Sequence, residues 1–311
     1  NYIHPDKFPN TPTINARLEL KRYTDPDHIN YDCEDYAPLS FDRPEPINHI
    51  PENTEITDPI AGRAACHVAP AEWRFLGWLE REKFDYDLYS ETQFHSNSFN
   101  LDDYKVLIIT THPEYWTRKM YNTLKTWVYE RGGKLMYLGG NGLNCEVEMI
   151  DESTMKVKNG DARKMEKHNK ESRFHIYNES EANLLGVVFS NEGIMTATPY
   201  QVVDCDHWIF SGTGLKNGSQ FGQESLHERI PGGASGHETD KTSPSSPANV
   251  QIVARGMNPD DGGAEMIYYD TPSGGEVFSV GSITYPSSIL LDEKISRITS
   301  NVIQRFSKTS S

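Results

Sequence analysis

Two short segments of the sequence hold most of the side chains that could carry out acid–base or metal chemistry. The first, residues 110–116, reads TTHPEYW and places His112, Glu114 and Tyr115 within four residues. An imidazole and a carboxylate exchange protons near neutral pH, and a phenol binds a metal once the metal lowers its pKa. The same residues also allow a structural role, in which His112 and Glu114 cap a helix and Tyr115 packs beneath it.

The second segment, residues 232–240, reads GGASGHETD and holds His237, Glu238 and Asp240 in a glycine-rich loop. Such side chains serve as metal ligands or as general acid and base. Polar loops of this composition also occur without a function. We expect this loop to lie at the same edge of the sheet as Tyr115, so that both segments face one cleft.

Both segments need a scaffold, and the pattern of apolar residues that follows Pro70 predicts one. A helix after Pro70 is followed by a strand-like alternation over residues 84–89 and by an apolar run over residues 105–110. A second helix is expected to begin at Pro113 and to end at a pair of glycines, before a strand over residues 134–138. Strands that alternate with helices predict an α/β fold with a doubly wound, mostly parallel sheet.

In such a sheet, ligands bind beyond the carboxyl ends of the strands, where loops and helix N-termini converge. The segment 110–116 follows one predicted strand, and the sequence GGNG at residues 139–142 follows the next. Glycines in this second loop allow the backbone to approach a ligand or a neighbour closely. We therefore expect the site at this edge of the sheet.

The remaining sequence divides into regions of different character. Residues 1–62 are rich in proline and are expected to form an extended arm or the tail of an upstream domain. Residues 63–311 are expected to form the α/β domain, with an irregular, β-rich insertion over about 142–247. Three strands follow, of which the last two are expected to form a hairpin, and Asp292 is expected to cap a closing helix.

Charge and composition exclude several classes of protein. Lys and Arg total 30 against 45 Asp and Glu, and the net charge of −15 repels nucleic acids and anionic membranes. No apolar stretch approaches the roughly 18 residues of a membrane helix, so no membrane insertion is expected. We expect a soluble protein that acts on a small molecule. The cytoplasm and the periplasm both stay open, as do a homo-oligomer and an additional domain upstream.

The longest motifs resemble a known enzyme family. Residues 111–116 (THPEYW) and 132–142 (GGKLMYLGGNG) resemble the C-terminal domain of the N,N-dimethylformamidase large-subunit family, and residues 40–44 (SFDRP) and 236–240 (GHETD) support the match. That domain is similar to class I glutamine amidotransferase and ThuA-like α/β folds. The resemblance therefore implies the fold class that the pattern of strands and helices predicts.

The resemblance also implies a hydrolase that cleaves an amide C–N bond at a mononuclear iron held by two tyrosines and one glutamate. Tyr115 falls on the tyrosine of the family's His-Pro-Glu-Tyr motif, and the glutamate ligand would be Glu179 or Glu181. The family's first tyrosine falls near residues 73–75, which read WRF in this chain. The chain has therefore either rebuilt the metal site or works differently.

Three functions follow as hypotheses. The first is a metal-dependent hydrolase of the dimethylformamidase-like superfamily, which cleaves an amide C–N bond or a related bond in a small polar substrate. The second is a non-catalytic sugar-binding or scaffolding module, and the third is a carbohydrate-directed hydrolase on the same fold. The candidate catalytic residues of the first hypothesis are His112, Glu114, His237 and Glu238. The aromatic side chains that would stack on sugars in the second are Tyr86, Tyr89, Trp208 and Tyr285.

Overall fold

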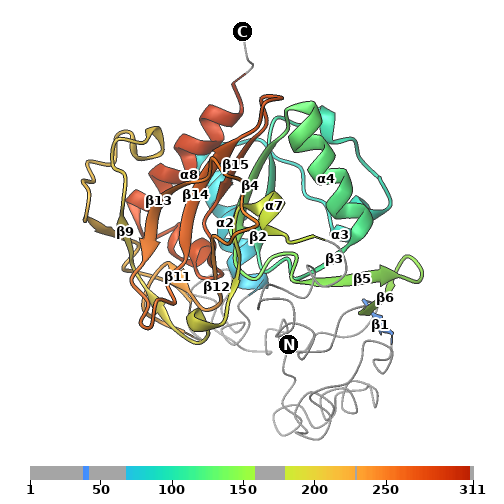
Figure 1. Ribbon diagram of the computed structural model, residues 1–311, viewed down its shortest axis with the longest axis horizontal. Helices are drawn as coiled ribbons and strands as arrows, with labels where there is room; N and C mark the ends of the chain where they lie inside the picture. The colour runs from blue at the N-terminus through green and yellow to red at the C-terminus, as the bar shows by residue number, and fades with distance from the viewer. Residues whose placement is uncertain (1–37, 42–67, 158–178, 228–229, 309–311) are drawn as a thin grey trace, which may run out of the picture.

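The computed structural model describes residues 38–41, 68–157, 179–227 and 230–308 of the chain (Figure 1). Its largest sheet has the strand order β10-β9-β13-β14-β15-β4-β2. The strands are β2 (Leu107–Thr111), β4 (Lys134–Gly139), β9 (Tyr200–Val202), β10 (Gln220–Phe221), β13 (Gln251–Gly256), β14 (Glu265–Asp270) and β15 (Glu276–Ser279).

Helices pack on both faces of this sheet, as Figure 1 shows for α4 and α8. Successive side chains of a strand point to opposite faces, and β4 follows this rule. Leu135 and Tyr137 pack with α4, whereas Met136 and Leu138 pack with α2 and α8. The helices are α2 (Ala69–Glu82), α3 (Glu91–His95), α4 (Arg118–Arg131), α7 (Ala182–Leu185) and α8 (Glu293–Phe306), and the 3₁₀ turns are η4 (Leu101–Asp103), η5 (Asn191–Gly193), η6 (Trp208–Phe210) and η7 (Tyr285–Ser288).

The predicted doubly wound, mostly parallel sheet of the class I glutamine amidotransferase kind is wrong. Within the large sheet as described, the β2–β4 and β4–β15 pairs are parallel and the other pairs are antiparallel. The short turn over residues 271–275 reverses the chain between β14 and β15, and such a turn joins only antiparallel strands. The fold is a mixed α/β arrangement in which a parallel part of the sheet continues into an antiparallel part.

Smaller sheets accompany the large one. A four-stranded sheet has the order β1-β6-β5-β3, and two two-stranded sheets pair β11 with β8 and β12 with β7. The pairing of β12 with β7 holds the chain on either side of residue 240 in an extended conformation. The strands are β1 (Leu39–Ser40), β3 (Tyr115–Thr117), β5 (Cys145–Met149), β6 (Thr154–Val157), β7 (Val188–Ser190), β8 (Ala197–Thr198), β11 (Ser235–Gly236) and β12 (Thr239–Lys241).

Two predicted elements differ from the structure. Residues 84–89 form no strand, and they remain largely exposed, so no buried face requires a partner strand there. The helix expected from Pro113 begins only at Arg118, because the Thr117 hydroxyl accepts the backbone N–H of Met120 at 3.2 Å and so caps α4. Tyr115 consequently lies on β3, and not on a helix.

Other predicted elements are confirmed. The strands expected over 105–110 and 134–138 correspond to β2 and β4, and β14 pairs with β15 as an antiparallel hairpin. Asp292 caps α8, since its Oδ1 accepts the N–H groups of Lys294 and Ile295 at 2.7 and 3.0 Å.

The predicted N-terminal arm lies outside the described residues except for 38–41, where β1 pairs with β6. The described segments contain no helix that is both long and apolar enough to cross a membrane.

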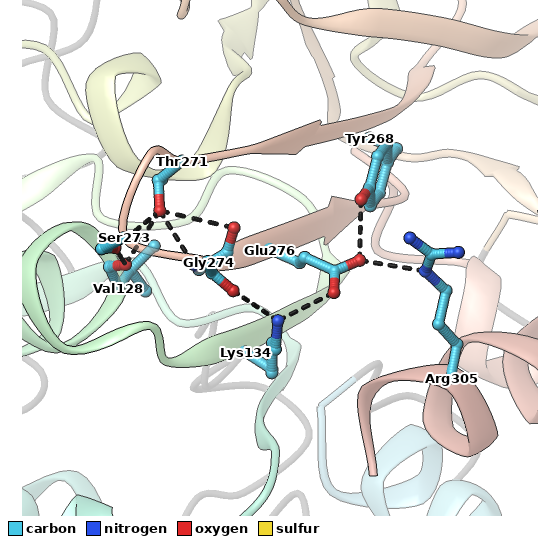
Figure 2. A network of polar contacts seen from close by, with 9 residues as sticks. Val128, Lys134, Tyr268, Thr271, Ser273, Gly274, Glu276 and Arg305 are labelled. Carbon is cyan, nitrogen blue, oxygen red and sulfur yellow. Dashed lines mark hydrogen bonds and ion pairs between the residues drawn. The ribbon is translucent and has the colours of Figure 1, made fainter. Parts of the chain in front are cut away.

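A carboxylate network ties the amino ends of the central strands to the last helix (Figure 2). Glu276, the first residue of β15, accepts hydrogen bonds from Lys134 Nζ at 2.8 Å, Tyr268 OH at 2.7 Å and Arg305 Nε at 3.0 Å. These donors come from β4, β14 and α8. Burial alone would raise the pKa of Glu276, but the hydrogen bonds outweigh it and lower that pKa. The network lies at the end of β4 and β15 opposite to Gly139 and Ser279.

We predict that Glu276→Gln destabilises the protein by about 1–3 kcal/mol at neutral pH, since a glutamine carries no charge to match Lys134 and Arg305. The lowered pKa means that this stabilisation is present above the unfolded pKa of about 4.3 and is lost as the pH falls through the folded pKa. Chemical unfolding of wild type and variant across acidic and neutral pH measures the difference. The control is Glu130→Gln at an exposed position of α4, and equal losses in both variants would contradict the prediction.

Candidate active site

Three of the predicted side chains meet at the carboxyl end of β2. His112 follows this strand directly, and its Nε2 lies 3.3 Å from Glu114 Oε2 and 3.4 Å from Glu238 Oε2. The side chains of His112, Glu114 and Glu238 are 15%, 17% and 23% exposed, so the cluster is largely shielded but still reaches the surface. The two loops that carry chemistry in the sequence therefore do lie together.

The loop after β4, residues 139–142, is the third part of the site. A Cβ on Gly140 would lie 2.5 Å from the carbonyl oxygen of Glu238, and a Cβ on Gly142 would lie 2.6 Å from Tyr137 OH. Contacts this short are not available to other residues. The two glycines therefore let this loop pass between the Glu238 backbone and the Tyr137 ring.

Asn141, between these glycines, points its side chain into the cluster. Its Nδ2 lies 3.1 Å from His112 Nε2. Because an amide N–H and a protonated ring N–H are both donors, the amide presents its Oδ1 to that nitrogen when His112 is charged. The amide is also close enough to Glu238 to lower the pKa of that carboxylate. The backbone of Asn141 has a φ of 52°, in the left-handed region that asparagine tolerates better than most residues. Sequence reasoning treated this loop only as a place of close backbone approach. The missed signal was an asparagine at a turn position directly after a buried strand.

A second polar layer lies beneath the cluster. Asp240 Oδ1 accepts the backbone N–H of Asn141 at 2.7 Å, and its Oδ2 accepts the hydroxyl of Tyr137 at 2.7 Å. The Tyr137 oxygen in turn accepts the backbone N–H of Gly142 at 2.7 Å. Asp240 was predicted as a member of the site, whereas Tyr137 was not, since its position within a buried strand resembles that of an ordinary core residue.

Charge within the cluster favours a protonated imidazole beside ionised carboxylates. Burial alone would lower the pKa of His112, but the hydrogen bond to Glu238 and the charges of Glu114, Glu238 and Asp240 outweigh it and raise that pKa. Burial alone would raise the pKa of Glu238, but its bonds to His112 and Asn141 lower it. The pair is therefore a proton donor next to a proton acceptor, as general acid–base chemistry requires.

Asp240 behaves differently because it is fully enclosed. Burial raises the pKa of Asp240 to about 7, in spite of the opposing hydrogen bonds from Asn141 and Tyr137. The charge of Glu238 contributes in the same direction as burial. Asp240 thus lies one layer away from the open part of the site, and its contacts are to the loop that carries Asn141.

The other predicted residues have different surroundings. Tyr115 is 40% exposed on β3, and both oxygens of Glu179 bond to Lys125 Nζ, at 3.0 and 2.8 Å. Glu181 is fully buried before α7, and its charge raises the pKa of Tyr121, after the larger effects of burial and Glu179. His237 is buried, with its ring centroid 5.8 Å from that of His227.

The predicted iron ligands differ in their surroundings. Glu179 is neutralised by a lysine, and residues 73–75 contribute no phenol. Within the described ranges, no three His, Cys, Asp or Glu side chains are grouped so that they could hold a metal ion. The iron implied by the resemblance stays a prediction, and the chemistry argued below uses the chain's own residues.

Comparison with known sequences shows the family of this chain. The family described as "N,N-dimethylformamidase beta subunit-like, C-terminal" matches residues 18–297, so the chain belongs to that family. The expected relation to N,N-dimethylformamidase is thus confirmed, but the family is beta-subunit-like, where the sequence motifs had suggested the large subunit. A glutamine amidotransferase-like domain does not follow from the match.

Two relatives are the N,N-dimethylformamidase beta subunits of Paracoccus aminophilus, 26% identical over 286 residues, and of an Alcaligenes species, 25% identical over 286 residues. Each alignment covers 77% of this chain and 37% of the relative. The chain therefore matches a little over a third of each relative's length.

We predict that Glu238→Gln lowers the pKa of His112, because the substitution removes the carboxylate whose hydrogen bond and charge raise it. NMR titration of the histidine ring signals measures this pKa, and Glu148→Gln, at an exposed position of β5, is the control. The raised pKa means that the charged imidazole stabilises the fold fully below about pH 6.5 and that this contribution is lost as the pH rises through the folded pKa. An unchanged His112 titration in Glu238→Gln would contradict the assignment of this pair.

Proposed function

We propose that this chain carries the hydrolytic site of an amide hydrolase related to N,N-dimethylformamidase, and that it cleaves a C–N bond in a small polar amide. The observation that carries the proposal is the contact of His112 with both Glu114 and Glu238 in a shielded cluster at the end of β2. Membership in the dimethylformamidase family supports the same reaction class.

In the proposed reaction, the Glu238 carboxylate accepts a proton from a water molecule as the water oxygen attacks the carbonyl carbon of the amide. The carbonyl π bond opens, and the oxygen that becomes negative receives a hydrogen bond from the Asn141 amide. His112 then donates its proton to the amide nitrogen. The C–N bond breaks as the C=O bond re-forms, which releases a carboxylic acid and an amine.

The proton balance closes within the cluster. After the reaction, Glu238 holds the proton taken from water and His112 lacks the proton given to the amine. The 3.4 Å contact between their side chains allows that proton to return to His112 directly. Glu114, 3.3 Å from the same nitrogen, stabilises the charged form of His112 throughout.

The sugar-binding alternative finds less support in the positions of the aromatic side chains. Tyr285 is fully buried and its hydroxyl bonds to Thr299 at 2.9 Å. Trp208 is stacked beneath the Arg305 guanidinium at 4.5 Å. Neither ring is free to stack on a sugar, which leaves Tyr86 and Tyr89 as the exposed rings among the four. A carbohydrate-directed hydrolase would use the same cluster, so a substrate screen separates it from an amidase.

Both relatives are named as beta subunits of N,N-dimethylformamidase. We propose that this chain also works within a larger assembly, either as a homo-oligomer or with an additional domain or subunit. Size measurement of the purified full-length protein in solution distinguishes a monomer from either form.

We predict that His112→Ala and Glu238→Gln each reduce kcat by about 10²–10⁴-fold while the protein remains folded, since each removes one half of the proton-transfer pair. Release of amine from formamide, N,N-dimethylformamide and longer amides measures turnover, and circular dichroism reports on folding. Because the pKa of Glu238 is lowered and that of His112 is raised, the activity plateau should extend below and above the ordinary values of these groups, about 4.3 and 6.5. Glu148→Gln is again the control, and full turnover in both site variants would sink the proposal.

The implied iron is tested separately. If Tyr115 binds ferric iron, the wild-type protein purified without chelator contains stoichiometric iron and shows a visible tyrosinate band. Tyr115→Phe then loses both, although the ring and its packing are retained. Equal metal content in wild type and Tyr115→Phe would remove Tyr115 from any metal site, and it would leave the acid–base proposal intact.

A further inference from the structure

The buried layer beneath the cluster is not used by the proposed reaction, yet it is unusually polar. Asp240 is 1% exposed and Tyr137 is fully buried, in a region of the core that also contains Leu124 and Leu135. A carboxylate in such surroundings costs free energy unless its oxygens are bonded. An aliphatic residue would avoid this cost. We therefore expect Asp240 and Tyr137 to have a role other than packing.

The hydrogen bonds of this layer converge on one loop. Asp240 accepts the N–H of Asn141 at 2.7 Å, and Tyr137, itself bonded to Asp240 at 2.7 Å, accepts the N–H of Gly142 at 2.7 Å. The peptide units before and after the Cα of Asn141 are thus both tied to the layer. With its backbone fixed in this way, the Asn141 side chain reaches His112 Nε2 at 3.1 Å.

The Asn141 backbone needs this support because its φ of 52° is uncommon for a residue with a side chain. An asparagine keeps that φ only where surrounding contacts hold it in place. Here the N–H groups of Asn141 and Gly142 are held by buried acceptors, Asp240 and Tyr137. Extended pairing of β12 with β7 holds Asp240 itself, since Asp240 lies opposite Phe189 in that ladder. The support therefore rests on regular structure and not on another loop.

We propose that Asp240 is a positioning residue, which acts with Tyr137 through the loop 140–142 to hold the Asn141 amide against His112 and Glu238. The inference rests on the proposed hydrolase function for its kinetic consequence, but the ordering of Asn141 does not depend on that function. Asp240 neither touches the open part of the site nor takes part in the proton transfer.

The charge of Asp240 provides a second measurable effect, on the pH dependence of activity, which a purely structural role would not produce. The ionisable groups that act on Asp240 are His112 after β2, Tyr137 on β4 and Glu238 before β12, and Asp240 in turn acts on Tyr200 of β9. The Asp240 charge is one of the contributions that raise the pKa of His112. Asp240→Asn should therefore move the alkaline limb of the kcat/KM profile to lower pH.

The first test is the mobility of the Asn141 side-chain amide, measured by ¹⁵N relaxation in the full chain. We expect an ordered amide in the wild type and a mobile one in Asp240→Asn and in Tyr137→Phe. Tyr137→Phe retains both the aromatic ring and the Asp240 carboxylate, so it is the variant to test if Asp240→Asn fails to fold. An Asn141 amide that stays ordered in the folded variant would overturn the proposal, whatever the protein hydrolyses.

The second test is a double-mutant cycle on turnover of formamide and N,N-dimethylformamide. A misplaced catalytic group costs about 10- to 100-fold in rate, and we expect Asp240→Asn or Tyr137→Phe to lower kcat by such a factor. In an Asn141→Gly background, which keeps both backbone bonds but lacks the amide, the same substitutions should cost less than 3-fold, roughly the limit of additivity. The same loss in both backgrounds would refute action through Asn141.

The two proposals fail in different ways. Turnover that survives His112→Ala and Glu238→Gln would defeat the hydrolase mechanism and leave the amide-ordering result standing. Loss of turnover in those variants, together with an ordered Asn141 in Tyr137→Phe, would defeat only the positioning role of Asp240.

Discussion

A charged imidazole between two carboxylates is the interaction on which the site depends. Removing three charges from water is costly, and mutual attraction repays the cost only where the groups are close and their remaining bonding positions are filled. His112 meets this condition through Glu114 and Glu238, whose Oε2 atoms lie 3.3 and 3.4 Å from its Nε2. Glu238 comes from a loop far from His112 in the sequence, so the attraction helps to fix how the carboxyl end of β2 and the loop before β12 lie together.

The backbone of the loop after β4 makes this arrangement possible. Gly140 passes the Glu238 carbonyl and Gly142 passes the Tyr137 hydroxyl at distances that leave no space for a side chain. Beneath it, Asp240 supplies an acceptor that the loop's N–H groups need once they are buried. The parallel strands β2 and β4 bring the segments to one edge, and the Glu276 network ties the opposite ends of β4 and β15 together.

Sequence reasoning located the parts of the site better than it described the fold around them. Local sequence patterns predicted the strands β2 and β4 and the polar residues directly after β2. Tertiary contacts did not override these patterns. The turn over residues 271–275 was recognised, but a local pattern does not reveal that β14 and β15 join the same sheet as β4, and the predicted parallel sheet failed there. Asn141 and Tyr137 were missed because their roles depend on Asp240, which lies about a hundred residues away in sequence.

The protonation state of His112 tests the account most directly. ¹⁵N NMR of the ring nitrogens distinguishes an imidazolium from either neutral tautomer, and His95 provides an internal reference, because burial and then the charge of Lys119 lower its pKa. At about pH 6.5, the ordinary histidine pKa, the account predicts that His112 is mostly imidazolium, with both nitrogens protonated, whereas His95 is mostly neutral. A neutral His112 under the same conditions would contradict the charged pair and the proton transfer built on it.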